Sequence, residues 1–200
     1  MKHTQNRTIR RWLLAAVVLL PLLTASKAKA DDVTVQWDIA NFVNGGIFPG
    51  GVLTQCSENG TYQMITLTGS GTFKLNGNGK PTGGGTWTIY PYAGYPLSSG
   101  TYLVTDFVSF DVAPGSLAMS GLTDYIGTLA DARGGLAFLH ILYSDGSQGV
   151  LGVLGTVINE GTFYVSKGIN FYPFLPCPGP TDNLPIGPSP IFHITVKGGK

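Results

Sequence analysis

Hydrophobic and polar residues alternate along much of the chain with a period of two, which is the pattern of half-buried β-strands. The first clear strand is expected at residues 31–39, where four apolar side chains alternate with polar ones. Three or four more strands are expected within residues 62–110, one at 161–168 and a last one at 191–196. After residue 30, no helical periodicity lasts longer than a turn or two. The pattern therefore predicts an all-β protein.

The most apolar part of the sequence is a predicted hairpin within residues 124–157. Side chains on its first strand are apolar on both sides, with Leu136, Phe138, His140 and Leu142 on one face and Ala137, Leu139, Ile141 and Tyr143 on the other. Such a strand is usually covered on both sides, in the middle of a barrel or sandwich or at an oligomer contact. Formation of a homo-oligomer therefore stays open.

Residues 144–149 form the turn of this hairpin, and Gly146 supplies the positive φ that a two-residue loop needs. A loop of Gly146 and Ser147 places His140 opposite Val153. A loop of Asp145 and Gly146 shifts the pairing by two residues. Both registers keep the same faces together.

Three stretches are expected to lie outside the sheet: residues 40–60, 112–123 and 173–190, the last of which holds seven prolines. The remaining strands predict a single antiparallel barrel of about eight strands, arranged as a meander with a Pro-rich loop before the last strand. Pairing of the last strand with the first would close the barrel, because closure removes exposed strand edges. Residues 31–200 are long enough for one such domain.

Residues 1–30 have the features of a secretory signal peptide: a basic leader, an apolar run and a small-x-small site at Ala28-Lys29-Ala30. The apolar run is shorter than the roughly 20 residues that span a bilayer, so stable membrane insertion is not expected. We therefore expect a secreted or periplasmic protein. After residue 30, six Lys and Arg remain against eleven Asp and Glu, and this acidic balance argues against nucleic acid as a partner.

The two cysteines, Cys56 and Cys177, are interpreted as a disulfide that closes a loop of about 120 residues, with two separate thiols as the alternative. No His or Cys stands at metal-ligand spacing, so no metal site is predicted. Phosphate loops, dinucleotide fingerprints and the Gly-x-Ser-x-Gly motif are absent, so no cofactor is predicted.

Three residues are candidates for catalysis. Arg133, the one arginine after residue 30, has a planar donor fork for a ligand, or alternatively pairs with nearby aspartates or loop carbonyls. His140 is either a general base or, more commonly in an apolar setting, an enclosed neutral histidine. Asp106 interrupts an apolar strand and is an acid or base if it points inward, or a solvated residue if it points outward. The sequence does not choose between these alternatives.

Arg133, Phe138 and Tyr143 are the candidate ligand contacts, because aromatic rings near a barrel end bind flat organic molecules by stacking. The alternative is that aromatic residues plug the barrel end. Lys167 is interpreted as an edge lysine that blocks aggregation or, if enclosed, as a low-pKa amine.

The stretch IGTLADARGGLAFLHILYSDGSQGVL, with ITLTGSGTF, GGGTWTIY and VSKG, resembles a family of secreted microbial proteins without an assigned activity. That resemblance carries over no functional residues. Residues 127–134 are also similar to the Gly-Thr-Gly-x-aromatic-x-x-Ala-Arg-Gly segment of dirigent proteins and allene oxide cyclase-like barrels, although the second glycine and the aromatic are missing. This second resemblance implies an eight-stranded barrel with an apolar cavity, Arg133 near a barrel end and Asp106 facing the cavity.

Three functional hypotheses follow. The leading one is a secreted β-barrel that binds a small hydrophobic or aromatic molecule in its cavity. The second is a cyclase- or isomerase-type enzyme in which Asp106 or His140 moves a proton and Arg133 stabilises negative charge. The third is a structural or surface-interaction protein whose barrel is filled by its own side chains.

Overall fold

The computed structural model describes residues 32–57, 63–91, 94–115, 117–119, 121–155, 162–168, 174–175 and 188–197. In these residues the secondary structure consists of β-strands and one short 3-10 turn, η1 (Leu117–Met119), so the all-β prediction is confirmed. None of the described residues belongs to a helix that is long and apolar enough to cross a membrane. The predicted signal peptide lies outside the described residues.

The strands are β1 (Asp32–Val43), β2 (Gly46–Pro49), β3 (Leu53–Ser57), β4 (Gln63–Leu67), β5 (Ser70–Lys74), β6 (Thr82–Pro91), β7 (Ser98–Val112), β8 (Thr123–Asp124), β9 (Ala132–Arg133), β10 (Gly135–Tyr143), β11 (Gln148–Gly155), β12 (Thr162–Val165), β13 (Phe174–Leu175) and β14 (Ser189–Lys197).

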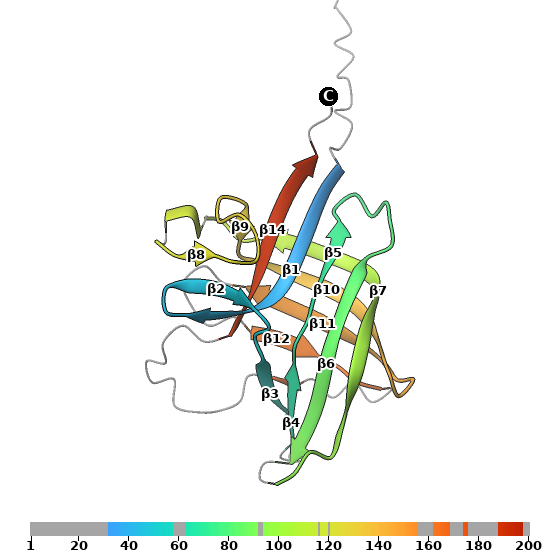
Figure 1. Cartoon of the computed structure of the whole chain (residues 1–200). Coiled ribbons are helices and arrows are strands. Elements are labelled where there is room, and N and C mark those ends of the chain that lie inside the picture. Colours follow the sequence, from blue (N-terminus) through green and yellow to red (C-terminus); the bar gives the residue numbers. More distant parts are fainter. Residues whose placement is uncertain are drawn as a thin grey trace, which may run out of the picture.

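All of these strands belong to one sheet with the order β4-β3-β13-β12-β11-β10-β7-β6-β5-β1-β14-β9, while β2 and β8 pair beside β1. Neighbouring strands are antiparallel except for β2 and β8, which are parallel, so the sheet is mixed. A further pairing joins β4 to β6. In Figure 1, β10, β11 and β12 cross behind β4 and β6. The predicted number of about eight strands is therefore too low, and the single meander is not confirmed.

The first and last strands pair side by side, as predicted, with Trp37 opposite Phe192 (Figure 1). Alternation along β1 also has the predicted effect, because Val35, Trp37 and Ile39 are buried on one face. The pairing of β1 with β14 does not itself close the sheet, however, because β9 pairs with the far edge of β14.

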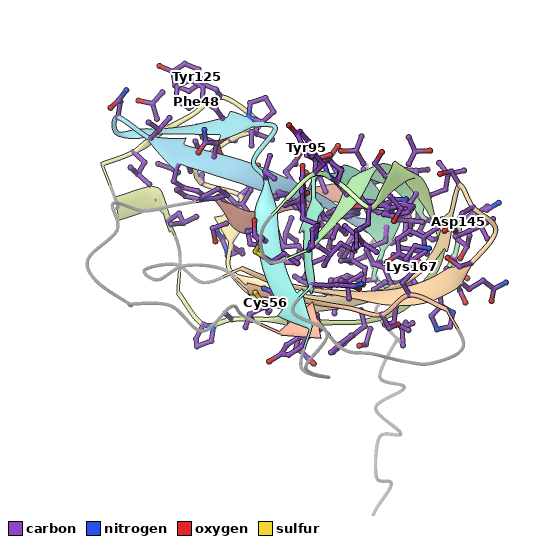
Figure 2. The ribbon with its side chains drawn as sticks, turned by 90° about the horizontal axis from the view of Figure 1, so that it is seen from below. Phe48, Cys56, Tyr95, Tyr125, Asp145 and Lys167 are labelled. Atoms are coloured by element: carbon purple, nitrogen blue, oxygen red, sulfur yellow. The ribbon has the colours of Figure 1, made fainter. Side chains whose placement is uncertain are left out.

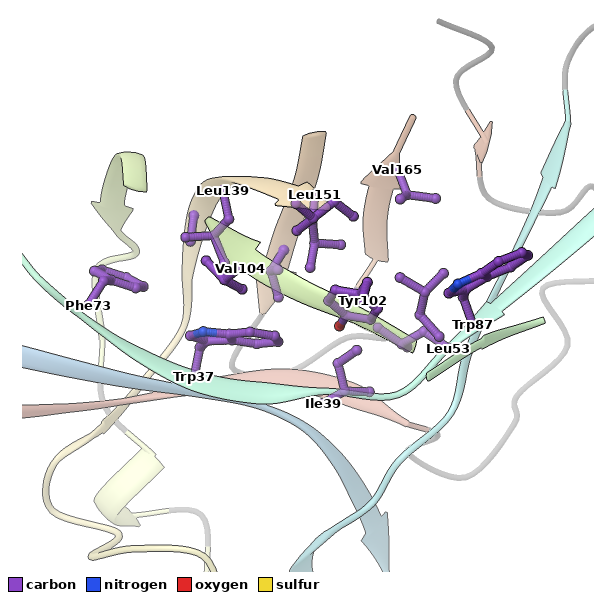
Figure 3. Close-up of a cluster of buried hydrophobic side chains, with 14 of the residues drawn as sticks. Trp37, Ile39, Leu53, Phe73, Trp87, Tyr102, Val104, Leu139, Leu151 and Val165 are labelled. Carbon is purple, nitrogen blue, oxygen red and sulfur yellow. The ribbon is translucent and has the colours of Figure 1, made fainter. Parts of the chain in front are cut away.

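The main hydrophobic core lies between the β1–β5–β6 side and the β10–β11 side of the sheet, and Figure 3 shows Trp37 and Ile39 facing Leu139 and Leu151. Its aromatic rings contact one another across strands. Ring centroids are 4.6 Å apart for Phe73 and Phe107, 5.6 Å for Trp87 and Tyr143, and 4.9 Å for Phe110 and Phe192. Burial of each such side chain contributes about 1.5–3 kcal/mol, so these rings are a main source of stability.

A bend between β4 and β5 is made possible by Gly69. A Cβ atom at Gly69 would lie 2.1 Å from the Tyr102 hydroxyl oxygen, so only glycine fits there without a shift. The Tyr102 hydroxyl donates a hydrogen bond of 2.9 Å to the carbonyl oxygen of Thr68. The bend that the sequence predicts near Gly69 is thus present, and it divides one run of chain into two strands.

The hairpin of β10 and β11 has a register that differs from both predicted ones. His140 pairs with Val150, and Leu142 with Gln148, so the loop consists of the three residues 144–146. Gly146 has a φ of +85°, which fits the left-handed position of a three-residue loop. One extra loop residue changes which side chains share a face, and Val153 therefore lies opposite Ala137 in the interior rather than opposite His140.

A second, smaller core lies on the opposite face of β1 and β14. It contains the buried residues Ala40, Phe42, Ile47, Leu117, Ala132 and Ile191, with Leu122, Ile126 and Leu129 packed against them. Residues 117–134, called the cap here, supply five of these side chains. Alternation explains the location, because Ala40 and Ile191 point away from Trp37 and Phe192 on their own strands.

Two of the three stretches predicted to lie outside the sheet contain strands that contribute substantially to it. Residues 40–60 hold the end of β1, all of β2 and all of β3, because the turn at Asn44 and Gly45 folds the chain back as a hairpin. Within residues 173–190, β13 pairs with β12 and β3. These strands are only two to five residues long, too short for alternation to reveal them, and β13 has partners that are distant in sequence.

Cys56 lies in β3, directly opposite Leu175 of β13. This pairing brings the chain two residues before Cys177 next to Cys56, although Cys177 itself lies outside the described residues. No free cysteine is present in the part of the chain that the structure describes. The Cys56–Cys177 disulfide remains a prediction, and the pairing of β3 with β13 supports it.

We predict that replacing both cysteines by serine lowers the free energy of unfolding by about 4 kcal/mol, because the disulfide restricts the unfolded chain. Urea unfolding of the oxidised wild type and of the double variant would measure this difference. Peptide mapping without reductant should yield a cross-linked peptide that contains both cysteines. Alkylation of two thiols in the folded, unreduced protein would contradict the prediction.

Candidate functional site

Two of the predicted catalytic residues, Asp106 and His140, lie opposite each other on β7 and β10. Both are exposed on the outer face of the sheet, so the expectation of an enclosed His140 is wrong. His140 is exposed because the interior face of β10 is formed by the alternate residues, from Ala137 to Tyr143. The backbone N–H of Phe107 donates a hydrogen bond of 2.9 Å to Asp106 Oδ1.

The outward position of Asp106 depends on two irregularities in the pairing of β7 with β10. The register shifts between Phe138 and Leu139 and again between His140 and Ile141, so that Thr105 and Val108 have no direct partner on β10. Each bulge adds one residue and reverses the alternation of faces. As a result, Val104, Phe107 and Phe110 pack against the core, while Asp106 between them points outward.

Arg133, the third predicted catalytic residue, lies in β9 and pairs with Phe192 of β14. Its Nη1 donates hydrogen bonds of 2.7 Å to the carbonyl oxygens of Ala130 and Ala132. This arrangement corresponds to the alternative in which Arg133 binds loop carbonyls and holds the segment that enters β10. β9 is the last strand in the order of the sheet and is adjacent to neither β7 nor β10. Arg133 therefore does not lie beside the Asp106–His140 pair in the sheet.

The predicted ligand contacts Phe138 and Tyr143 lie on opposite faces of β10. Phe138 is half-buried on the outer face with His140, whereas Tyr143 is buried in the main core. The Tyr143 hydroxyl donates a hydrogen bond of 3.0 Å to the carbonyl oxygen of Ser166, and burial raises the pKa of Tyr143 far above its usual value. The structure therefore brings Phe138, His140 and Asp106 together but leaves Tyr143 and Arg133 apart from them.

A buried contact between an aspartate and a histidine links the cap to β14. His193 Nε2 lies 2.6 Å from Asp124 Oδ2, and both side chains are almost fully buried. The other oxygen, Asp124 Oδ1, accepts hydrogen bonds from the backbone N–H groups of Ile126 and Gly127. A Cβ atom at Gly127 would lie 2.6 Å from the His193 ring, so the backbone of the cap passes directly against that ring.

A second buried carboxylate, Asp38, lies near this pair. Gln36 Nε2 donates a hydrogen bond of 2.8 Å to Asp38 Oδ2, and Gln36 itself is opposite His193 in the β1–β14 pairing. Burial raises the pKa of Asp38, and the Gln36 hydrogen bond and His193 oppose this rise only in part. Burial also raises the pKa of Asp124, but hydrogen bonds from His193, Ile126 and Gly127 outweigh it, so the pKa of Asp124 is lowered.

The sequence analysis missed this Asp38–Asp124–His193 cluster because Asp124 and His193 are 69 positions apart and no local spacing links them. His193 Nδ1 is buried and has no hydrogen-bond partner among the described residues. In that part of the chain, no group of three or more His, Cys, Asp or Glu has the geometry to hold a metal ion. The described contacts indicate a structural role, in which the pair fastens the cap to the sheet.

Lys167 closes one end of the main core. Its Nζ forms an ion pair with Asp145. The same atom lies 4.6 Å from the centroid of the Trp87 ring and 4.9 Å from that of the Tyr143 ring. Ser147 Oγ is a further partner at 2.9 Å. The Lys167 hydrogen bond lowers the pKa of Asp145 to about 2. Figure 2 shows Asp145 and Lys167 together at one end of the molecule.

Phe48 and Tyr125 form a stacked pair where β2 meets β8, with ring centroids 4.5 Å apart, and Figure 2 shows them away from Lys167.

Comparison with known proteins gives no match to this chain among family models, curated proteins or solved structures. The resemblances to secreted microbial proteins and to dirigent-type barrels therefore stay predictions, and the candidate site has to be interpreted from its own geometry.

We predict that Asp124→Asn and Asp38→Asn change stability in opposite directions at neutral pH. The lowered pKa of Asp124 means that its ionised form stabilises the fold above the usual pKa of 3.8, and that this contribution is lost as the pH falls through the lowered pKa. Loss of the carboxylate that makes these hydrogen bonds should lower the free energy of unfolding by about 1.5–3 kcal/mol at neutral pH.

The raised pKa of Asp38 has the opposite sign, because ionisation of this buried carboxyl destabilises the fold as the pH rises from 3.8 through the raised pKa. Asp38→Asn should therefore raise the free energy of unfolding at neutral pH by about 1 kcal/mol. Urea unfolding at a series of pH values checks both variants. Equal effects of the same sign at neutral pH would be inconsistent with these assignments.

Proposed function

We propose that the protein is an exported binding protein that acts through its outer surface, while its own side chains fill its interior. The observation that carries this proposal is the main core, in which large aromatic residues from facing strands contact one another. Those side chains occupy the space that a cavity for a small ligand would need. This proposal favours the third of the hypotheses drawn from the sequence.

The proposal includes a small barrel formed by β3, β4, β6, β7, β10, β11, β12 and β13. Support comes from the pairing of β4 with both β3 and β6, because the succession of paired strands then returns to its starting point. A barrel of about eight strands is narrow enough for side chains to fill. β1, β5 and β14 would extend this barrel at one end and carry the cap.

Three polar groups of the interior support the same interpretation, whereas Trp37 Nε1 in the same core has no hydrogen-bond partner among the described residues. Tyr102 and Tyr143 donate their hydroxyl hydrogens to backbone carbonyls, and Trp87 Nε1 donates to the carbonyl of Thr101 at 3.1 Å. A cavity that recognises a ligand usually directs a few polar groups toward it. Here these three groups are already engaged by the chain itself.

The positions of the candidate catalytic residues weigh against the cyclase or isomerase alternative. Asp106 and His140 are exposed to solvent on the outer face, so they do not share an enclosed cavity in which a bound substrate would be shielded from water. Arg133 donates to loop carbonyls in another part of the sheet. A shared interior site would need all three side chains around one cavity.

We predict that the wild-type protein shows no saturable rise in melting temperature with benzene, because its interior has no space for the probe. Leu139→Ala should lower the free energy of unfolding by about 3–5 kcal/mol, because removal of this buried side chain leaves a dry apolar cavity. Benzene should bind in that cavity and restore part of the lost stability. Thermal unfolding with increasing benzene provides the measurement.

Leu97→Ala is the matched control, because it is the same change at an exposed position just before β7 and outside the strands of the outer face. Its effect on stability should be within about 0.5 kcal/mol, with no response to benzene. A saturable rise in the melting temperature of the wild type would refute the filled interior and favour the cavity for a small hydrophobic molecule.

A further inference from the structure

We infer that the outer face of the strands β7, β10, β11 and β12 is the docking surface for a second copy of this chain. This inference rests on the proposed function, since it names the partner of the outer surface. The residues that form this outer face are Leu103, Asp106, Phe138, His140, Leu142, Val150 and Tyr164.

Strand pairing places these side chains in three adjacent rows. Leu103 is opposite Leu142, His140 is opposite both Asp106 and Val150, and the third row runs from Phe138 across Gly152 to Tyr164. Residues directly opposite each other in a sheet have Cβ atoms about 4.5–5.5 Å apart, so the rows form one continuous patch. The patch therefore has apolar side chains around a central acid–base pair.

Large apolar residues in this patch are exposed to solvent. The exposed fraction is 62% for Leu103, 41% for Tyr164 and 37% for Leu142. The other face of the same strands packs in the main core, so the first strand of the hairpin is apolar on both sides but covered on one side by the described residues. An exposed apolar patch of this kind marks an interaction site.

Gly152 makes the centre of the outer face flat. A Cβ atom at Gly152 would lie 2.8 Å from Cε1 of Phe138, so the Phe138 ring lies across the backbone of β11. The same position is 3.5 Å from Cβ of Tyr164. Two sheets that pack face to face stack about 10 Å apart, and their side chains interdigitate between them. The outer face has the shape for packing against another sheet.

The charges of the outer face fit a second copy better than other partners. The described sequences of β7, β10, β11 and β12 contain no Lys or Arg, which disfavours anionic lipid and nucleic acid. Asp106 and His140 lie side by side near the centre. A two-fold axis there would bring the acid of each copy toward the histidine of the other, so the face is self-complementary.

The area of the outer face indicates a reversible dimer. The face covers roughly 400 Å², if about seven residues each are counted on β7, β10 and β11 and the four residues of β12, with strands about 4.8 Å apart. A standard stable interface buries about 800 Å² on each partner, so this face supplies about half of that area. We therefore expect a dimer that forms at high protein concentration and dissociates on dilution.

The test is the concentration dependence of molecular mass, measured by sedimentation velocity on the exported chain, residues 31–200. The wild type should shift from monomer to dimer as its concentration rises. Leu142→Lys places like charges in the apolar patch and should raise the dissociation constant at least tenfold, which corresponds to about 1.4 kcal/mol.

Leu75→Lys is the matched control, because Leu75 has nearly the same exposed fraction, 40%, but lies beyond the end of β5 and away from the outer face. It should dimerise like the wild type, and both variants should unfold at the melting temperature of the wild type. Equal weakening by the two substitutions would overturn the inference.

A wild type that stays monomeric at every concentration also overturns the inference. Binding of that monomer, but not of Leu142→Lys, to phosphatidylcholine vesicles would assign the outer face to a lipid surface instead. The benzene experiment separates these results from the proposed function. A monomer whose interior excludes benzene refutes only the dimer, whereas a dimer that takes up benzene refutes only the filled interior.

Discussion

Contacts between aromatic rings across strands hold the structure together. Phe73 of β5 stacks on Phe107 and meets the edge of Phe110, both from β7, and Phe110 contacts Phe192 of β14. Trp87 of β6 contacts Tyr143 of β10 in the same way. Each ring buries about 150–250 Å², and edge or stacked contacts add to that burial. These contacts therefore connect strands that do not all hydrogen-bond to one another.

The two bulges of β7 link this core to the outer surface. They turn Phe107 and Phe110 inward to meet their aromatic partners, and they leave Asp106 between them pointing outward. The irregularity that completes the ring contacts also places a carboxylate beside His140 on the outer face. The two bulges therefore decide both how the interior packs and which residues lie on the outer face. Our functional proposals depend on these bulges.

The cap depends on a different kind of interaction. Its apolar residues form the second core, but the contact of Asp124 with His193 and the pairing of β9 with β14 fix where the cap lies. Apolar packing is non-directional, whereas a buried hydrogen-bonded pair tolerates few alternative positions. The cluster therefore gives the cap one defined position on β1 and β14. Burial in this cluster also raises the pKa of Asp38, so its ionised form destabilises the fold.

The sequence by itself determined the all-β class, the inward face of β1, the positive φ of Gly146 and the pairing of β1 with β14. The first three features depend on alternation and on glycine geometry, which local residue patterns reveal, whereas the pairing of β1 with β14 was expected from the general tendency of sheets to protect their edges. Tertiary structure alone decided the register of the β10–β11 hairpin, the outward position of Asp106 and the meeting of Asp124 with His193. A loop residue or a bulge reverses the faces of a strand, and contacts between distant segments depend on how the sheet packs, so no local pattern specifies them.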